Sequence, residues 1–295
     1  MIRIDKITRG RFGNRILQYN SAYQMAKKIG TEIHCGEWEG FDVFKNLPSS
    51  ENVYNRDKKI YSWEECLEDS WQGVKELHST HDLVLDDPAY MLHNVFYKLT
   101  EIAPRNFMKI RSELRPNLSK EAVHIGIHIR GDDIISRDGN GGREIHGTKY
   151  YIDAIEAIEK EEPDRLKVYY VCSDDLTFQT FKETIRHLME SGKTAYCGPA
   201  TGNPSTINHV MDFSLLSECD YLIASSSTYA VCAGLVGKEK RIIHSNAWLQ
   251  KNVDHEPWHN YEDEDRVRRQ QISFDNFWIE VYNGGNKFYK AWKII

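Results

Sequence analysis

The sequence lacks several features that define other classes of protein. It has no apolar run approaching the roughly 18 residues that cross a membrane, and its opening, MIRIDKITRG, has no apolar signal core. It also has no internal repeat, no low-complexity tract and no C-x-x-C pair among its six cysteines. We therefore expect a cytoplasmic chain without disulfides or an integral membrane segment, at most peripheral to the inner face of a membrane.

An excess of basic charge is absent as well. Asp and Glu number 44 against 38 Lys and Arg, which gives a formal net charge of −6. Proteins that bind nucleic acid through its phosphates are usually basic, so we predict no nucleic-acid partner. Any anionic ligand then requires a local cationic site. Hydrophobic residues make up 40% of the 295, enough for the cores of one large or two ordinary domains.

Apolar periodicity predicts strands that alternate with helices, and hence an α/β fold with a mostly parallel sheet. Near the start, a helix is expected at 16–30, ending at a glycine, between strands at 1–7 and 31–38. Later strands are expected at 123–129, 166–175, 220–225 and 240–245, and later helices at 148–163, 176–192 and 208–219. Because the polar segment 115–121 is typical of a linker, we predict domains at 1–119 and 120–295, the second including a C-terminal tail.

Candidate site residues lie where the later strands end, because parallel sheets bind ligands at the carboxyl ends of their strands. Arginine presents a rigid fork of donors that suits a phosphate, and hydroxyl and N–H groups at a helix start also favour anions. A carboxylate at a strand end can accept bonds from guanine N–H groups or ribose hydroxyls. The candidates are His128, Arg130, Asp132 and Asp133, then Asp174 and Asp175, then Ser226, Ser227 and Thr228 of the SSST segment 225–228.

Each of these clusters also has a simpler interpretation. Arg130 would be a surface arginine paired with Asp132 or Asp133. Ser227 or Thr228 would only cap a helix, as would the acids at 174 and 175. The local sequence does not separate these alternatives.

The loop GRFGNR, 10–15, is a further candidate, because its glycines would admit a ligand close to the backbone. Its spacing does not fit the dinucleotide motif G-x-G-x-x-G. Gly13 and Asn14 are the residues of interest, and the simpler alternative is a tight turn before a helix.

Two other motifs match known metal sites in their letters only. HEPWH, 255–259, has the spacing of a zinc protease motif, but Pro257 disfavours the helix that the motif needs. The acidic run YEDED, 261–265, has no apolar strand before it, so we interpret it as a solvated charge run. We therefore predict no metal site.

The motifs, taken in order, resemble those of the bacterial α-1,2-fucosyltransferases of glycosyltransferase family 11. GRFGNRILQYNSAYQMAKKIG is similar to their opening G-G-x-G-N-Q segment, HIRGDDI to H-x-R-R-G-D-Y, and VYYVCSDD to their strand ending in S-D-D. MDFSLLSECDYLIASSSTYAVCAGLVG is similar to their segment around N-S-T. The similar motifs lie between about residues 9 and 250, with almost none at 40–118. The wider superfamily includes α-1,6-fucosyltransferases and protein O-fucosyltransferases.

The resemblance implies a GT-B fold, with two Rossmann-like domains facing a central cleft. It also implies that fucose is transferred from GDP-fucose, with inversion and without a metal or other cofactor. The acceptor would be a hydroxyl of a glycan or glycolipid, and the transferred fucose would be joined to a sugar of that acceptor in α-1,2 linkage. The first domain, including the irregular region 40–118, would serve the acceptor side, and the second would bind the nucleotide sugar.

The resemblance also implies roles for the candidate residues. Arg130 would meet the charge that develops on the β-phosphate, and the acid pair would hold guanine. Asn14 would approach the sugar and acceptor. The general base is left open: Asp133 or Asp132 is the carboxylate nearest in sequence, and a loose, ionised transition state would need no strong base. The assisting donor-binding residues would be His128, Gly13, Ser226, Ser227 and Thr228.

The sequence departs from the family pattern at several positions. Gly131 replaces the second arginine, Asp132 the following glycine, and Ser226 the asparagine of N-S-T. Val231 and Cys232 replace a tryptophan pair. These changes leave two alternatives open, namely a different nucleotide sugar as donor, or a non-catalytic relative that binds a nucleotide or sugar.

Overall fold

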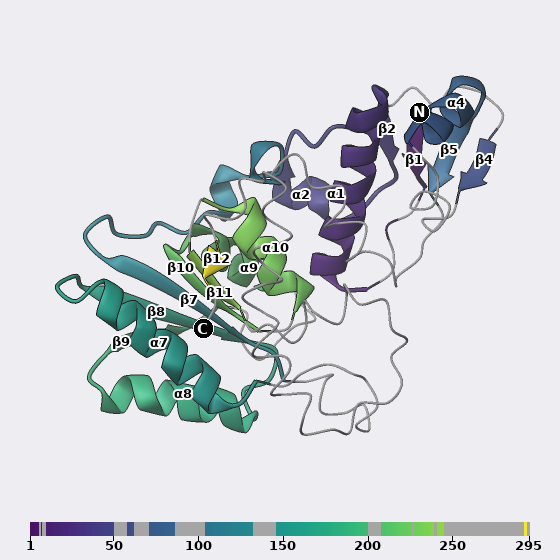
Figure 1. Cartoon of the computed structure of the whole chain (residues 1–295). Helices are drawn as coiled ribbons and strands as arrows, with labels where there is room; N and C mark the ends of the chain where they lie inside the picture. Colours follow the sequence, from purple (N-terminus) through teal and green to yellow (C-terminus); the bar gives the residue numbers. More distant parts are fainter. Residues whose placement is uncertain are drawn as a thin grey trace. The chain divides into compact units, whose positions relative to one another are not determined.

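The chain forms two compact units, Met1–Arg111 and Ser112–Ile295, in a computed structural model (Figure 1). The structure describes residues 1–5, 7, 10–49, 58–61, 71–85, 104–131, 146–199, 208–225, 227–238, 241–244 and 292–293. The first unit ends at Arg111, eight residues before the boundary that the sequence predicts at 119. None of the described helices has the length and hydropathy to span a membrane.

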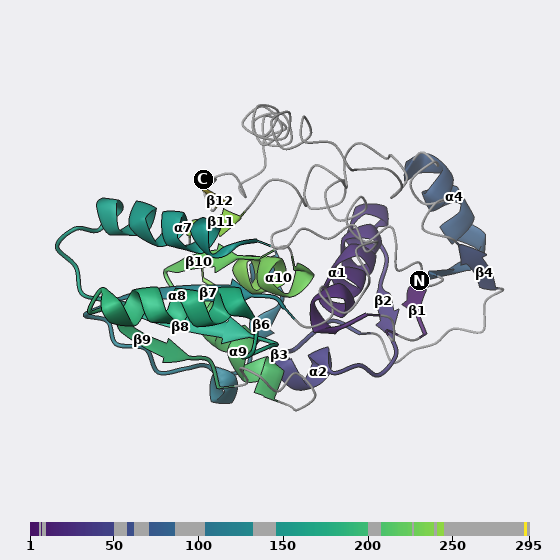
Figure 2. The same cartoon turned by 90° about the horizontal axis from the view of Figure 1, so that it is seen from below.

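The first unit is built on a four-stranded parallel sheet in the order β2-β1-β5-β4. Its strands are β1 (Ile2–Ile4), β2 (Ile33–Cys35), β4 (Lys58–Tyr61) and β5 (Asp82–Leu85). Helix α1 (Phe12–Ile29) joins β1 to β2 and packs against both (Figure 2). Helix α4 (Trp71–Thr80) precedes β5.

Smaller elements complete the described part of this unit. They are α2 (Gly40–Val43), the antiparallel pair β3 (Phe44–Lys45) and β6 (Lys109–Ile110), and the 3-10 turn η1 (Pro104–Asn106). The core gathers aromatic side chains of α1 and of the segment after β2, with Trp38 between Tyr19 and Phe44. The strands expected at 1–7 and 31–38 and the helix expected at 16–30 are confirmed as β1, β2 and α1.

Helix α1 ends as the sequence predicts, but it begins earlier. Gly30 adopts the left-handed conformation, φ 75°, and its N–H closes the last turn, as a C-cap glycine does. The first helical residue is Phe12 rather than Ile16, so Gly13 and Asn14 lie inside the first turn. Arg11 occupies the N-cap position without a side-chain cap, which is why no capping signal marked this start.

The second unit contains a six-stranded sheet in the order β12-β11-β10-β7-β8-β9, and all its neighbouring strands are parallel. Its strands are β7 (Val123–Ile129), β8 (Lys167–Ser173), β9 (Thr194–Cys197), β10 (Tyr221–Ala224), β11 (Arg241–His244) and β12 (Trp292–Lys293). Its helices are α7 (Thr148–Glu161), α8 (Gln179–Glu190), α9 (Asn208–Glu218) and α10 (Thr228–Val236), after the 3-10 turn η2 (Ser112–Leu114). The parallel sheet predicted from residue 123 onward is confirmed.

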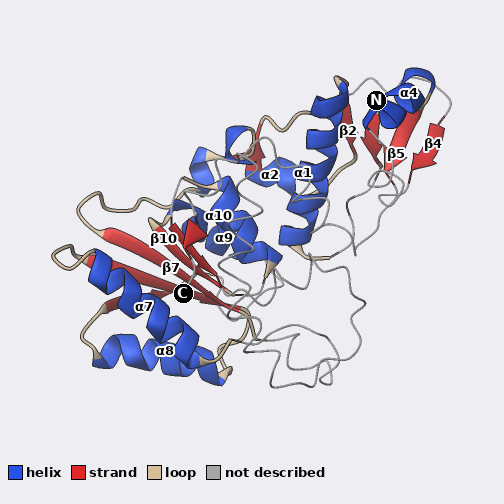
Figure 3. Ribbon diagram, in the orientation of Figure 1, coloured by secondary structure: helices blue, strands red, loops and turns tan. Residues whose placement is uncertain are grey.

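Helices cover both faces of this sheet, which explains why every side chain of β7 is buried. Helices α7 and α8 lie on one face of the sheet (Figure 3). On that face, Ile125 and Ile127 belong to a core that includes Ile155 of α7 and Leu188 of α8. On the other face, a Cβ at Gly126 would stand 2.8 Å from Leu216 of α9. Gly126 and His128 of β7 therefore face α9 and α10 rather than water, and His124 is buried beside Tyr170 of β8.

The strand order changes direction between β7 and β10. From β7 the chain moves outward through β8 to β9, and it then returns to the other side of β7 with β10 and continues to β12. Sheets of this kind bind ligands at the carboxyl ends of the two strands that flank the change. The fold therefore directs attention to the residues that follow Ile129 and Ala224.

Candidate functional site

Two hydrogen bonds join the end of β7 to the segment between β10 and α10. His128 Nδ1 and Ser225 Oγ share a bond of 2.6 Å, and both side chains are buried. Arg130 Nη1 donates to Ser227 Oγ over 3.3 Å. The structure thus brings together His128, Arg130 and Ser227, which the sequence singled out, with Ser225, the first residue of the predicted SSST segment. All of them lie at the carboxyl ends of the strands that flank the change in strand order.

Ser227 stands at the N-cap position of α10, but its side chain does not cap the helix. Its backbone N–H donates to the carbonyl of Ser225 over 2.7 Å, and its carbonyl accepts from Val231 N–H over 3.1 Å. The hydroxyl is left to accept from Arg130. Thr228 is the first residue of the helix, so N–H groups and the helix dipole lie beside the guanidinium and favour an anion there.

The ring of Tyr229 lies next to His128, and the buried carboxylate of Asp212 acts on Tyr229. The ring centroid of Tyr229 is 5.2 Å from that of His128. Burial, and then the charge of Asp212, raises the pKa of Tyr229 well above its usual value, and the same two causes act on the pKa of Cys172. Asp212 is only 5% exposed. The sequence analysis did not select it, although a single carboxylate in the apolar run VMDFSLL was a usable signal.

Both carboxylates of the acid pair after β8, Asp174 and Asp175, accept hydrogen bonds from the protein itself. Asp174 Oδ1 accepts the backbone N–H of Gly131 over 2.7 Å, which ties the end of β7 to the end of β8. Asp175 Oδ1 accepts from both the N–H and the hydroxyl of Thr177, at 2.7 and 2.6 Å. The Thr177 hydroxyl is the main reason why the pKa of Asp175 is lowered. Asp175 therefore has a structural role, but in a turn before α8 rather than as the cap of that helix, whose N-cap position is Phe178 without a side-chain cap. Asp174 joins the two strand ends.

Gly131, where the family pattern has a second arginine, lies against an aromatic side chain. A Cβ at this position would stand 3.0 Å from Cγ and Cδ1 of Phe178. Phe178 itself packs on the core beneath α8. A side chain at 131 would therefore require the Phe178 ring to shift by a few tenths of an ångström, so this ring favours glycine at the position.

In the first unit, the loop at 10–15 is held by its own contacts. Gly10 has φ +75°, and a Cβ there would come within 2.3 Å of Asn14 Nδ2. Arg15 Nε donates to the Gly10 carbonyl over 3.1 Å, and its Nη1 donates to Glu39 over 2.8 Å. Gly13 is buried at the start of α1. The loop is thus a defined structure, and the part of Gly13 and Asn14 in sugar transfer stays a prediction.

Several predicted features lie outside the described residues. They are Asp132, Asp133, Ser226, the HEPWH segment and the YEDED run. Across the ranges that the structure does describe, no three His, Cys, Asp or Glu side chains are grouped so that they could hold a metal ion.

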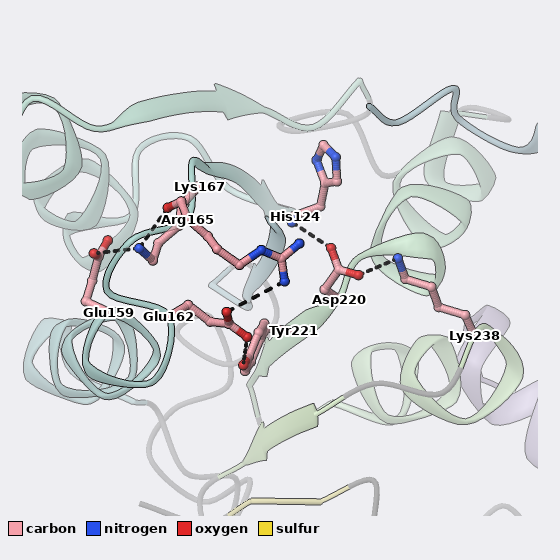
Figure 4. A network of polar contacts seen from close by, with 8 residues as sticks. All are labelled: His124, Glu159, Glu162, Arg165, Lys167, Asp220, Tyr221 and Lys238. Carbon is pink, nitrogen blue, oxygen red and sulfur yellow. Dashed lines mark hydrogen bonds and ion pairs between the residues drawn. The ribbon is translucent and has the colours of Figure 1, made fainter. Parts of the chain in front are cut away.

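The amino ends of the same strands carry a different polar cluster (Figure 4). Asp220 accepts from the N–H of His124 and from Lys238 Nζ, both over 2.8 Å. Glu162 accepts from the Tyr221 hydroxyl over 3.0 Å and pairs with Arg165 at 3.6 Å. A third group joins Glu159 to Lys167 at 3.4 Å and to Lys193 at 2.8 Å. Here carboxylates meet cations directly.

Comparison with solved structures identifies the fold. A mutant of Arabidopsis thaliana FUT1 in complex with GDP matches with a TM-score of 0.51 at 14% identity, over 83% of this chain and 70% of that one. POFUT1 in complex with GDP-fucose matches with a TM-score of 0.50 at 9% identity, over 81% and 95%. Fucosyltransferase NodZ from Bradyrhizobium has a TM-score of 0.47 at 14% identity, over 80% and 93%. The fold is that of the GT-B glycosyltransferases.

The sequence itself identifies the family. Residues 86–268, more than half of the chain, match the model of Glycosyl transferase family 11. The chain therefore belongs to glycosyltransferase family 11, as its motifs suggested. No curated protein sequence matches it.

Proposed function

We propose that this glycosyltransferase transfers fucose from GDP-fucose to a hydroxyl of a glycan or glycolipid, with inversion, without a metal and in α-1,2 linkage to a sugar. The observation that carries the proposal is the group formed by His128, Arg130, Ser225 and Ser227 at the amino end of α10. Membership of family 11 supports transfer of fucose. The GDP and GDP-fucose complexes of the similar structures support the guanine nucleotide.

The chemistry explains why such a group is needed. As the bond between the sugar and the β-phosphate breaks, the phosphate gains negative charge and the sugar becomes positive. Without a metal, fixed donors of the protein have to stabilise that charge. Arg130, the Ser227 hydroxyl and the first N–H groups of α10 are such donors, already held in place by mutual contacts. Loss of one preorganised donor typically costs about 3 kcal/mol of transition-state stabilisation.

Other roles complete the proposal. Asp174 accepts an N–H of the Gly131 backbone, and as a carboxylate at the edge of the site it could accept the N–H groups of guanine in the same way. Asp175 is the weaker candidate, because its Oδ1 already has two donors at Thr177. Asp133 as general base and Asn14 as the residue facing the acceptor are proposed from their positions in the motifs. The first unit would bind the acceptor.

The donor class is tested by thermal unfolding with GDP, GDP-fucose, UDP or ADP. A ligand at about 100 times its Kd adds about 2.7 kcal/mol of stability, a shift of several degrees for a unit of this size. We expect a shift with the guanine nucleotides alone and its loss in Arg130→Ala. Arg165→Ala is the matched control, because it removes an arginine from the opposite edge of the same sheet and should keep the shift.

The other parts of the proposal are tested by turnover. Release of GDP from GDP-fucose, with a panel of sugar acceptors, should proceed equally with and without EDTA. A shift with UDP, or turnover only with another nucleotide sugar, would reject fucose as the donor. Binding without any transfer or hydrolysis would favour the non-catalytic alternative.

A further inference from the structure

Tyr150 reaches the carboxyl edge of the sheet from the opposite side to α10. It lies in the first turn of α7, and its side chain packs on the core between α7, α8 and the sheet. Its hydroxyl is 2.9 Å from the carbonyl oxygen of Ala224 and 3.1 Å from that of Ile243. These carbonyls belong to neighbouring strands, β10 and β11, where both strands approach their ends. A single phenolic proton is thus shared between two strand ends.

Ala224 is the last residue before the segment that contacts His128 and Arg130. Ser225 follows it directly and bonds to His128. Ser227, two residues further on, accepts from Arg130, and its N–H donates to the Ser225 carbonyl over 2.7 Å. The positions of Ser225 and Ser227 therefore depend on where the Ala224 peptide is held. We call the three described residues Ser225, Ser227 and Thr228 the donor turn.

The ring of Tyr150 is itself held in place. The ring of His146, which is 7% exposed, lies 4.6 Å from it. The ring of Tyr151 meets it edge to face at 5.0 Å, and Tyr151 is fully buried. Two aromatic rings thus pack against the phenol, in the position from which its hydroxyl bonds to the two carbonyls.

We propose that Tyr150 is a positioning residue for the donor turn. By holding the Ala224 carbonyl, Tyr150 fixes the position of the Ser227 hydroxyl and of the amino end of α10. It thereby sets the distance from both of these groups to the Arg130 guanidinium. It does not touch the donor. The inference rests on the proposed function, because it concerns the geometry in which the leaving phosphate is stabilised.

Tyr150→Phe tests the inference, because it keeps the ring and its packing and removes one hydroxyl. Misplaced donors should weaken stabilisation of the transition state more than binding of the substrate. We expect kcat for transfer from GDP-fucose to fall about tenfold, comparable to the loss of one hydrogen bond, with a smaller change in KM. Tyr221→Phe is the matched control. It removes the hydroxyl that bonds Glu162 at the other end of the same strand and should leave kcat unchanged.

A double variant gives a readout that a purely structural role would not change. If Tyr150 acts through the donor turn, then Tyr150→Phe should cost less in a Ser227→Ala background than in the wild type. An equal cost in both backgrounds, or the same kcat in Tyr150→Phe and Tyr221→Phe, would overturn the inference alone. A wild-type enzyme that transfers no fucose would overturn the proposed function and this inference together.

Discussion

Similar polar residues are used in different ways at the two ends of the strands in the six-stranded sheet. We call the row of amino ends the amino edge and the row of carboxyl ends the carboxyl edge. At the amino edge, Asp220 pairs with Lys238 and Glu162 with Arg165 (Figure 4). At the carboxyl edge, His128 and Arg130 have serine hydroxyls among their partners. A carboxylate offsets the charge of the cation that it meets, whereas a hydroxyl orients a cation without neutralising it. The cations of the amino edge therefore have their charge balanced within the protein. The arrangement at the carboxyl edge is suited to binding an anion.

The same comparison separates strength from function. Ion pairs that are exposed to water contribute only about 0–1 kcal/mol each, and those of the amino edge are mostly half exposed. They are therefore expected to matter little for stability and not at all for the reaction. The following predictions test the comparison, from the largest expected effect to the smallest.

Loss of the guanidinium at the carboxyl edge should have the largest effect. Arg130→Ala is expected to lower kcat/KM for GDP-fucose by about 100-fold or more, because a preorganised donor is lost from the transition state. The kcat/KM of Arg130→Lys should lie between those of the wild type and Arg130→Ala, since lysine keeps the charge but loses the planar fork. Steady-state kinetics provides the measurement. If Arg165→Ala lost as much activity as Arg130→Ala, the proposed division between the edges would be wrong.

A side chain at the close contact after β7 should reduce stability. Gly131→Val is expected to lower the free energy of unfolding by about 1–3 kcal/mol, because the ring of Phe178 has to move. Gly147→Ala is the control, since a Cβ at Gly147 meets nothing within 4 Å. Urea unfolding of both variants gives the comparison. Equal stability would mean that the Phe178 ring gives way without cost.

Acid should weaken the amino edge. Burial opposes ionisation of Asp220, but the His124 N–H and the Lys238 ammonium outweigh it and hold its pKa below the usual value. A carboxyl whose pKa is lowered on folding adds stability above its unfolded pKa of about 3.9, and this is lost as the pH falls further. At neutral pH the wild type should therefore have a higher melting temperature than Asp220→Asn. The corresponding difference in the free energy of unfolding should be no more than about 1 kcal/mol. The difference should disappear as the pH is lowered below 4, and a constant difference would contradict this account.

The smallest effect is expected for an ion pair on the outer face of α7. Lys149 pairs with Asp153 at 2.7 Å, but its side chain is 84% exposed. Lys149→Ala should change the free energy of unfolding by less than about 0.5 kcal/mol. Chemical denaturation can detect a larger change, which would show that exposed pairs contribute more in this protein than the comparison assumes.

Much of this arrangement could be predicted from local sequence. The period of two in VHIGIHI gave β7 with the bounds that the structure shows, and the apolar spacing of TKYYIDAIEAIEKE gave α7 from Thr148. Because the strands are parallel, the residues after them had to share one edge, so His128, Arg130 and Ser227 were expected to meet. Their roles in the reaction remain predictions.

Other features depend on contacts that no local pattern records. Tyr150 looked like an ordinary helix residue, since its bonds go to carbonyls more than 70 residues away. The contact of Gly131 with Phe178 is equally non-local. Strand β12 has only two residues, too few for any periodicity. In the region that the sequence analysis left as irregular, β5 was hidden because its pattern is short and follows polar residues.

The sequence separation within the site has a consequence for how the enzyme is made. Both hydrogen bonds that join β7 to the donor turn connect residues 97 positions apart. Strands of such separation pair late, because a long loop has to close before the contact is formed. During refolding, GDP should therefore bind only after β10 has docked beside β7. A nucleotide that is recognised this way acts as a reporter of completed assembly, and it selectively stabilises chains that have finished folding.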